Sequence, residues 1–257
     1  MEYLRPKTID EALELLSEGI PLAGGTQLTV ERYELSRVID LQPLGLDQLR
    51  EQDGVVHIGA MTTLQQLMAT EVPLPERLKE ACRSEAAWNI RNQATLGGLL
   101  MSADGRSPLL TVLAALDPQL KLAPGEEKVN LATFFKRRSS KVRNFLLLEI
   151  FFNKPVCFAY DFVARAPMDI PLVSAAAAVV SRDKESVQIA IGGYGEQPIF
   201  WSEILDADDQ AAVLSAVAEK AKQRFEAADD AFASAEYRAE IAGTLSRRAV
   251  SEVLEAC

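Results

Sequence analysis

Apolar residues recur at helical spacing near both ends of the chain. Thr8 and Glu11 have the spacing of a capping box, and Gly19 can end the helix that follows. The apolar stripe of this first helix consists of Ile9, Ala12, Leu13 and Leu16. Two longer helices are expected at the C-terminus, with stripes at Leu214, Val217, Ala218, Ala221 and Phe225 and at Tyr237, Ile241, Leu245, Ala249 and Val253.

Short apolar runs separated by turns predict strands between these helices. The expected strands cover residues 20–23, 37–41, 55–59, 120–122, 128–131, 145–152, 156–164 and 187–191. The pair Gly192-Gly193 closes the last of them, and residues 91–98 are turn-like.

Further helices are expected between these strands. Thr62 and Gln65 can cap a helix through Met68, and Pro108 can open a helix through residue 115. Residues 76–86 predict another helix, and the alanine-rich run 172–180 predicts a buried helix within residues 171–180. The pattern indicates an α+β chain with domains at residues 1–154 and 155–257, the first divided into subdomains of about 1–52 and 53–154.

The overall charge excludes some partners. The chain has 257 residues, 48% of them hydrophobic, a net charge of −10 and a pI of about 4.8. An acidic protein of ordinary globular composition is a poor binder of nucleic acid or anionic membranes, because the Coulomb energy opposes both. The basic residues between Lys136 and Arg143 are interpreted as a solvated loop. No apolar run approaches the roughly 20 residues of a membrane helix, and we expect a cytoplasmic protein.

The sequence offers no set of side chains for catalysis or for metal binding. Cys82, Cys157 and Cys257 lie far apart without a CxxC pair, a pattern that suits a reducing compartment and does not favour an iron-sulfur cluster. His57 is the single histidine, expected on a strand at the surface or half-buried, and neither a metal site nor a serine triad accompanies it. The acidic pairs 208–209 and 229–230 are expected to stabilise helix starts. No catalytic and no metal-ligating residue is therefore assigned.

The remaining candidate for a binding site is the backbone at two glycine pairs, each of which lies near a threonine. Gly24-Gly25 follows an expected strand and precedes Thr26, and Thr95 precedes Gly97-Gly98. Glycine lets the main chain approach a ligand, and successive amides can converge on an anion such as a pyrophosphate. A tight turn is the alternative for either pair alone, and neither matches a P-loop or a dinucleotide fingerprint.

Five stretches of the chain resemble one family over nearly its whole length. These are residues 3–6 with 11–16, Leu-Ala-Gly-Gly-Thr at 22–26, residues 58–64, Ile-Arg-Asn-Gln-Ala-Thr-Leu-Gly-Gly at 90–98, and residues 233–238 with 242–243 and 247–248. The chain resembles the FAD-binding (medium) subunit of the molybdenum hydroxylase family, of the xanthine dehydrogenase and aerobic carbon monoxide dehydrogenase type.

The resemblance implies a fold and a cofactor site. The fold is a two-subdomain FAD-binding domain of the PCMH or vanillyl-alcohol-oxidase type, followed by a smaller α+β C-terminal domain. Both glycine loops would hold the FAD pyrophosphate, mostly through backbone amides. The implied cofactor-binding residues are Leu22, Ala23, Gly24, Gly25, Thr26, Gln27, Leu28, Ala86, Ile90, Ala94, Thr95, Gly97, Gly98, Ser102, Leu146 and Leu147.

The resemblance also implies electron transfer within a complex. A molybdenum-cofactor subunit would be the source of electrons, an iron-sulfur subunit would deliver them to FAD, and NAD or another acceptor would receive them. Three positions depart from the family pattern: Leu99 and Pro108 replace polar residues, and Asp161 stands where some members carry lysine. A flavin-free or weakly flavin-binding scaffold subunit is therefore the alternative. A stand-alone NAD-binding enzyme is a third interpretation, which no fingerprint supports.

Overall fold

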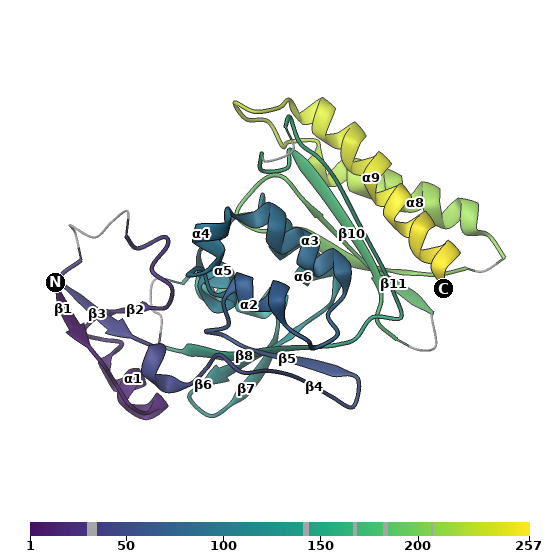
Figure 1. Cartoon of the computed structure of the whole chain (residues 1–257). Coiled ribbons are helices and arrows are strands. Elements are labelled where there is room, and N and C mark those ends of the chain that lie inside the picture. Colours follow the sequence, from purple (N-terminus) through teal and green to yellow (C-terminus); the bar gives the residue numbers. More distant parts are fainter. Residues whose placement is uncertain (30–34, 141–143, 167–168, 182–184, 207) are drawn as a thin grey trace. The chain divides into compact units, whose positions relative to one another are not determined.

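A computed structural model describes residues 1–29, 35–140, 144–166, 169–181, 185–206 and 208–257 (Figure 1). The chain forms two compact units that are interleaved in sequence. The first unit contains Met1–Pro73, Ala86–Ser102 and Pro118–Phe152, and the second contains Leu74–Glu85, Ala103–Asp117 and Asn153–Cys257.

A small parallel sheet begins the first unit. Strands β1 (Glu2–Leu4) and β2 (Ile20–Leu22) both pair with β3 (Arg37–Asp40). Helix α1 (Ile9–Leu15) makes the crossover between β1 and β2, two parallel strands that lie on either side of β3. The predicted start of this helix is confirmed, because Thr8 Oγ1 accepts a hydrogen bond of 3.2 Å from Glu11 N, and Glu11 Oε2 accepts one of 2.7 Å from Lys7 N.

A five-stranded sheet forms the larger part of the first unit. Its order is β4 (Leu49–Gln52), β5 (Val55–Gly59), β8 (Leu146–Asn153), β6 (Gln119–Ala123) and β7 (Glu127–Asn130). The remaining elements of the unit are the 3₁₀ turn η1 (Gln42–Leu44) and the helices α2 (Leu64–Ala69), α4 (Trp88–Arg91), α5 (Leu96–Ser102) and α7 (Leu131–Arg138).

Two expectations for the first unit are corrected in detail. Helix α2 has its capping box one residue later than predicted, with Thr63 as the cap and Gln66 as the reciprocal partner. Thr62 cannot serve because its side chain is fully buried. The basic residues from Lys136 onward were expected in a solvated loop. Instead, Arg138 ends helix α7, is buried, and donates to Leu100 O at 2.6 Å. Lys141 and Arg143 lie outside the described residues.

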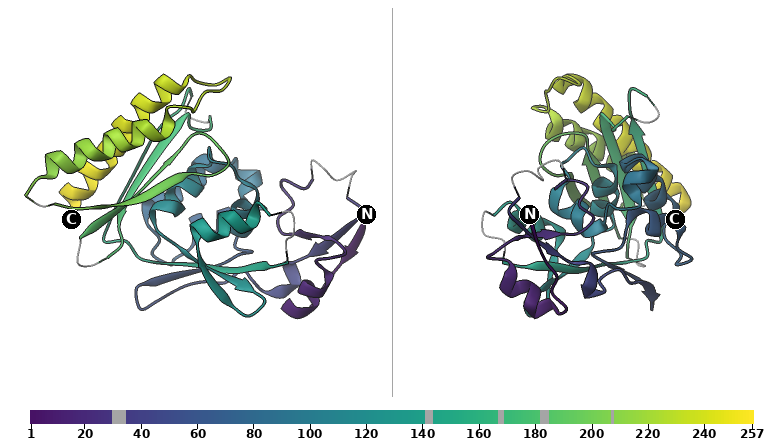
Figure 2. Two further views of the ribbon diagram at one scale, coloured as in Figure 1. Left: turned by 180° about the vertical axis from the view of Figure 1, so that it is seen from behind. Right: turned by 60° about the vertical axis from the view of Figure 1, so that its left-hand side comes forward.

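A four-stranded antiparallel sheet organises the second unit. Its order is β12 (Ile199–Ile204), β11 (Ser186–Gly192), β10 (Val173–Val179) and β9 (Cys157–Val163). The long helices α8 (Gln210–Phe225) and α9 (Ala235–Ala256) cover one face, while α6 (Pro108–Ala115) packs on the other face with α3 (Glu76–Glu85) against it (Figure 2). The predicted start of α6 is confirmed, with Ser107 as its N-cap.

The predicted buried helix at residues 171–180 is wrong, because this segment is strand β10. All seven of its residues are buried. The odd-numbered side chains belong to the core beneath α8 and α9, whereas Ser174 faces α6 and donates to Thr111 Oγ1 at 3.1 Å. A strand covered on both faces shows no alternation of apolar and polar residues, so the sequence period could not distinguish it from a helix.

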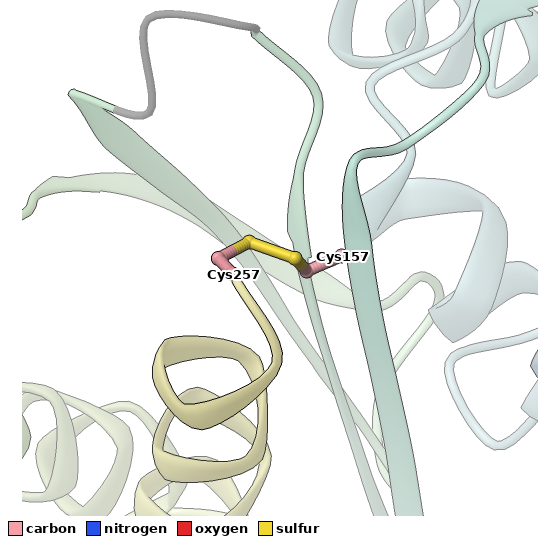
Figure 3. The surroundings of a disulfide bond; sticks show 2 residues. All are labelled: Cys157 and Cys257. Atoms are coloured by element: carbon pink, nitrogen blue, oxygen red, sulfur yellow. A yellow bond between two sulfur atoms is a disulfide. The ribbon is translucent and has the colours of Figure 1, made fainter.

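A disulfide and a buried arginine with its partners stabilise the second unit. A disulfide joins Cys157 at the start of β9 to Cys257 after α9, with the Cα atoms 5.8 Å apart (Figure 3). The count and spacing of the cysteines did not predict this bond. The fully buried Arg238 pairs with Asp230 at 2.8 Å and donates to the carbonyl oxygens of Ala228 and Ala233.

In the part of the chain that the structure describes, no helix is both long and apolar enough to span a bilayer.

Candidate functional site

The first glycine loop follows β2 directly and presents unpaired donors. Gly25 has a φ of +71°, a conformation that favours glycine, and its carbonyl oxygen accepts from Thr29 N at 2.9 Å and from Thr29 Oγ1 at 2.6 Å. The amides of Gly24, Gly25 and Thr26 donate to no acceptor within the described residues. Consecutive N–H groups of this kind can bind an anion.

The second glycine loop has a different local structure from the one expected. Gly97 and Gly98 lie in the first turn of α5 rather than in an open turn. Gly97 N donates to Ala60 O at 2.8 Å and Gly98 N donates to Thr95 Oγ1 at 3.1 Å. Ser102 Oγ donates back to Gly98 O at 2.8 Å. Both glycine amides are therefore occupied inside the protein, which corrects the expectation that this pair supplies backbone donors.

The two loops touch each other, and glycine makes the contact possible. A Cβ atom on Gly24 would lie 1.8 Å from Gln93 O and 2.6 Å from Gln93 C, far inside van der Waals contact. A Cβ atom on Gly98 would lie 3.9 Å from Ala23 Cβ. The backbone of the first loop thus rests on the peptide that leads into the second, although the two are distant in sequence.

A cavity of about 420 Å³ opens where the loops meet, within the size range of small-molecule sites. Three of its lining residues were predicted from the sequence: Ala23, Gly24 and Thr95. The lining residues that the prediction missed are Gln42, Leu46, Asp47, Met61, Thr63, Gln66, Asn92 and Gln93. Asn92 and Gln93 lie between predicted site residues, so their place in the chain was a signal. The residues at 42–47 reach the cavity only through the tertiary fold.

The other predicted site residues do not line this cavity. Leu22, Gly25, Thr26, Gln27 and Leu28 adjoin the lining residues of the first loop along the chain, and Ala94, Gly97, Gly98 and Ser102 belong to the second loop or to α5. None of these nine is itself a lining residue, and the remaining four lie outside both loops: Ala86, Ile90, Leu146 and Leu147.

These four residues have distinct surroundings. Ala86 and the partly exposed Ile90 flank and form α4, and Ala86 O accepts a 2.5 Å hydrogen bond from the guanidinium of Arg91. Leu146 and Leu147 are buried in β8, where Leu146 packs against Ala12 and Ala123 in a small apolar core.

The single histidine, His57, lies on β5 and does not line the cavity. His57 is half-buried on β5, as predicted, and its Nδ1 lies 3.2 Å from a carboxylate oxygen of Glu149. Among the residues that the structure describes, no group of three or more His, Cys, Asp or Glu side chains could hold a metal ion. Asp161, one of the departures from the family pattern, forms a 3.1 Å ion pair with Arg248 in the second unit.

Comparison with known proteins agrees with this arrangement. Residues 1–152 match the family described as the FAD binding domain in molybdopterin dehydrogenase, and residues 158–253 match the carbon monoxide dehydrogenase flavoprotein C-terminal domain. The Escherichia coli K12 protein YgfM is 31% identical over 206 residues, which cover 77% of this chain and 76% of YgfM.

Two further relatives cover nearly the whole chain. The 6-hydroxypseudooxynicotine dehydrogenase complex subunit alpha of Paenarthrobacter nicotinovorans is 28% identical over 98% of this chain and 94% of its own. A solved structure of carbon monoxide dehydrogenase from Hydrogenophaga pseudoflava superposes with a TM-score of 0.85 at 23% identity, covering 100% of this chain and 98% of that one, which shows the shared fold.

The family match spans more than half of the chain. The two glycine loops of the chain meet at a cavity whose volume is within the range of small-molecule sites. The chain therefore belongs to the FAD-binding medium subunits of the molybdenum hydroxylase family, is an oxidoreductase subunit, and has FAD as its cofactor.

Proposed function

We propose that the cavity between the two glycine loops holds the pyrophosphate of FAD. The contact of Gly24 with Gln93 carries this proposal, because it brings the unpaired amides of the first loop to the rim of a cavity that the second loop completes. The amides of Gly24, Gly25 and Thr26 would donate to the phosphate oxygens, and no shift of the backbone is needed to free them.

The second loop would supply shape rather than backbone donors. Gly97 and Gly98 allow α5 to lie close to Ala60 and Ala23, so that Thr95 can form a wall of the cavity. The other residues assigned by family resemblance would line the rest of the cofactor: Ala86, Ile90, Ala94, Ser102, Leu146 and Leu147. We also propose that the N-terminal domain ends near residue 154, as the sequence pattern suggests.

The functional role that we propose is electron transfer. FAD supplies the redox chemistry when bound, and this chain binds it, orients it and limits its access to solvent. An iron-sulfur partner subunit would deliver electrons that originate at a molybdenum-cofactor subunit, and NAD or another acceptor would take them up. Support comes from the relatives, which are subunits of dehydrogenase complexes.

A binding experiment tests the cofactor site directly. The purified chain is stripped of flavin and titrated with FAD, and binding is followed by the flavin absorption band and by thermal unfolding. We expect saturable binding in the parent chain and a loss of at least about 100-fold in affinity in Gly24→Val, because the two loops can no longer meet. Gly54→Ala is the control for adding a side chain at a glycine of the same unit, since no atom lies within 4 Å of its Cβ position and the strain from its positive φ (+80°) is confined to the turn between β4 and β5.

A parent chain that stays colourless and shows no thermal shift with excess FAD would contradict the proposal and would favour the scaffold role. The electron-transfer role has its own test, in which the reduced iron-sulfur partner is mixed with the flavin-loaded chain and flavin absorption is followed. Reoxidation by NAD is then compared with reoxidation by other acceptors. A flavin that the partner cannot reduce would exclude the proposed electron path while leaving the binding site in place.

A further inference from the structure

Among the eleven described residues that line the cavity, one has an acidic side chain. This residue is Asp47, and the other polar members of the wall are neutral amides and hydroxyls. None of the described lining residues is a lysine or an arginine. The wall thus presents the backbone of Gly24, which the amides of Gly25 and Thr26 follow in the chain, and a carboxylate from another segment, which accepts hydrogen bonds.

The side chain of Asp47 is exposed at the cavity. Within the described part of the chain, its oxygens form no hydrogen bond and no ion pair. The nearby Asp40 differs, since it pairs with Arg5 at 3.0 Å and accepts from Gln42 N at 3.0 Å. Asp47 therefore has its full accepting capacity available for a ligand.

The backbone on both sides of Asp47 is fixed in place. Leu46 O accepts from Met61 N at 2.7 Å, and Gln48 O accepts from Gly59 N at 2.7 Å. The lack of a side chain at Gly59 is required, because a Cβ atom there would lie 2.2 Å from Leu46 O. The main chain is thus held on either side of this residue, so Asp47 is presented to the cavity by a braced segment rather than by a free loop.

We infer that Asp47 binds sugar hydroxyl groups of FAD, an inference that rests on the proposed cofactor site. A carboxylate beside a pyrophosphate would repel it, so a site that holds both needs hydrogen-bond donors on the ligand next to Asp47. The hydroxyl groups of the ribose and of the ribityl chain are such donors, and both lie next to the phosphates in FAD. A carboxylate that accepts from a ribose diol is a common solution in nucleotide sites.

The test compares Asp47→Ala and Asp47→Asn with the parent chain in FAD titrations at one fixed ionic strength. Loss of a hydrogen bond to a charged group predicts FAD affinity lower by about tenfold or more in Asp47→Ala. Glu51→Gln is the matched control, because Glu51 lies close by on β4, is exposed, and does not line the cavity. We expect the control to bind FAD as the parent does, and thermal unfolding without ligand to be similar in all four proteins.

Competition with ligand fragments identifies the sugar. ADP contains the ribose and lacks the ribityl chain, whereas FMN contains the ribityl chain and lacks the ribose. If Asp47 holds the ribose, the substitution weakens ADP and leaves FMN unchanged; if it holds the ribityl chain, the reverse is expected.

Three outcomes would overturn the inference. These are equal FAD affinity in Asp47→Ala and Glu51→Gln, tighter FAD binding in Asp47→Asn through relief of repulsion, and a loss seen with FAD but with neither fragment. A parent chain that binds no FAD would instead reject the proposed cofactor site, so the two failures are distinguishable.

Discussion

The two glycine pairs, Gly24-Gly25 and Gly97-Gly98, have different structural roles although both consist of residues without a side chain. Around Gly24-Gly25, the backbone has a left-handed residue and unpaired amides, and it lies directly on the peptide of Gln93. Around Gly97-Gly98, the backbone is helical and both amides are already bonded within the protein. The first pair offers donors to a ligand, and the second allows a helix to pack closely.

This difference shows that a glycine pair beside a threonine does not by itself define an anion site. The threonines also differ: Thr95 is buried and accepts from Gly98 N, whereas Thr26 is partly exposed in the loop after Gly25. Four glycine-to-alanine substitutions can break or sharpen the comparison, because each adds one methyl group at a position with known neighbours.

The largest effect is expected for Gly24→Ala. The new Cβ would lie 1.8 Å from Gln93 O, a backbone atom that cannot rotate away, so the two loops must separate. We expect the free energy of unfolding to fall by about 3 kcal/mol, at the upper end of overpacking effects. Denaturant unfolding measures this change. Stability equal to that of the parent chain would mean that the two loops are not in contact.

A smaller loss of stability is expected for Gly97→Ala. Its Cβ would lie 2.7 Å from Ala60 O and 2.9 Å from Ala60 Cβ, and the gain in helix propensity offsets part of the clash. A fall of about 1–2 kcal/mol in the free energy of unfolding is predicted. If this pair has only a packing role, FAD affinity measured below the unfolding range falls less than in Gly24→Ala. An equal fall in both variants would argue against that role.

An intermediate effect of a different origin is expected for Gly25→Ala. The new Cβ would lie 3.3 Å from Leu22 Cδ1, the end of a side chain that can shift slightly, and the φ of +71° is unfavourable for alanine. The left-handed conformation costs about 1 kcal/mol, and Gly25→Asn recovers part of it because asparagine tolerates this region. Chemical denaturation of the pair measures the difference. Equal stability of the alanine and asparagine variants would show that backbone strain is not the cause.

The smallest change in stability is expected for Gly98→Ala. Its Cβ would lie 3.0 Å from Thr95 Oγ1 and 3.9 Å from Ala23 Cβ. The close contact with Thr95 lowers stability, whereas the higher helix propensity of alanine raises it. These two effects nearly cancel, so the free energy of unfolding changes by no more than about 1 kcal/mol. FAD affinity is the informative measurement here. A loss without destabilisation would show that this face of α5 touches the cofactor, and unchanged affinity would remove Gly98 from the site.

Much of the local structure followed from neighbouring residues in the sequence. The start of α6 at Pro108, the strand at Val55–Gly59 and the stripes of α8 and α9 all depend on residues a few positions apart. Strands β1, β4 and β12 were not predicted, because β1 and β4 have only three and four residues and exposed positions interrupt the apolar pattern of β4 and β12. In the site, the glycine pairs were visible, but Asp47 was not, since only β4 and β5 bring its segment to the cavity.

The sequence by itself therefore determined the starts of α1 and α6, most strands, the family and the two loops that could meet a nucleotide. Tertiary structure alone decided that residues 173–179 form a strand, that Cys157 reaches Cys257, and that Gly24 rests on Gln93. The physical reason is the range of the interactions. Caps and turns satisfy hydrogen bonds within one or two turns of chain, whereas burial on both faces of a sheet and close approach of two backbones depend on segments far apart in sequence.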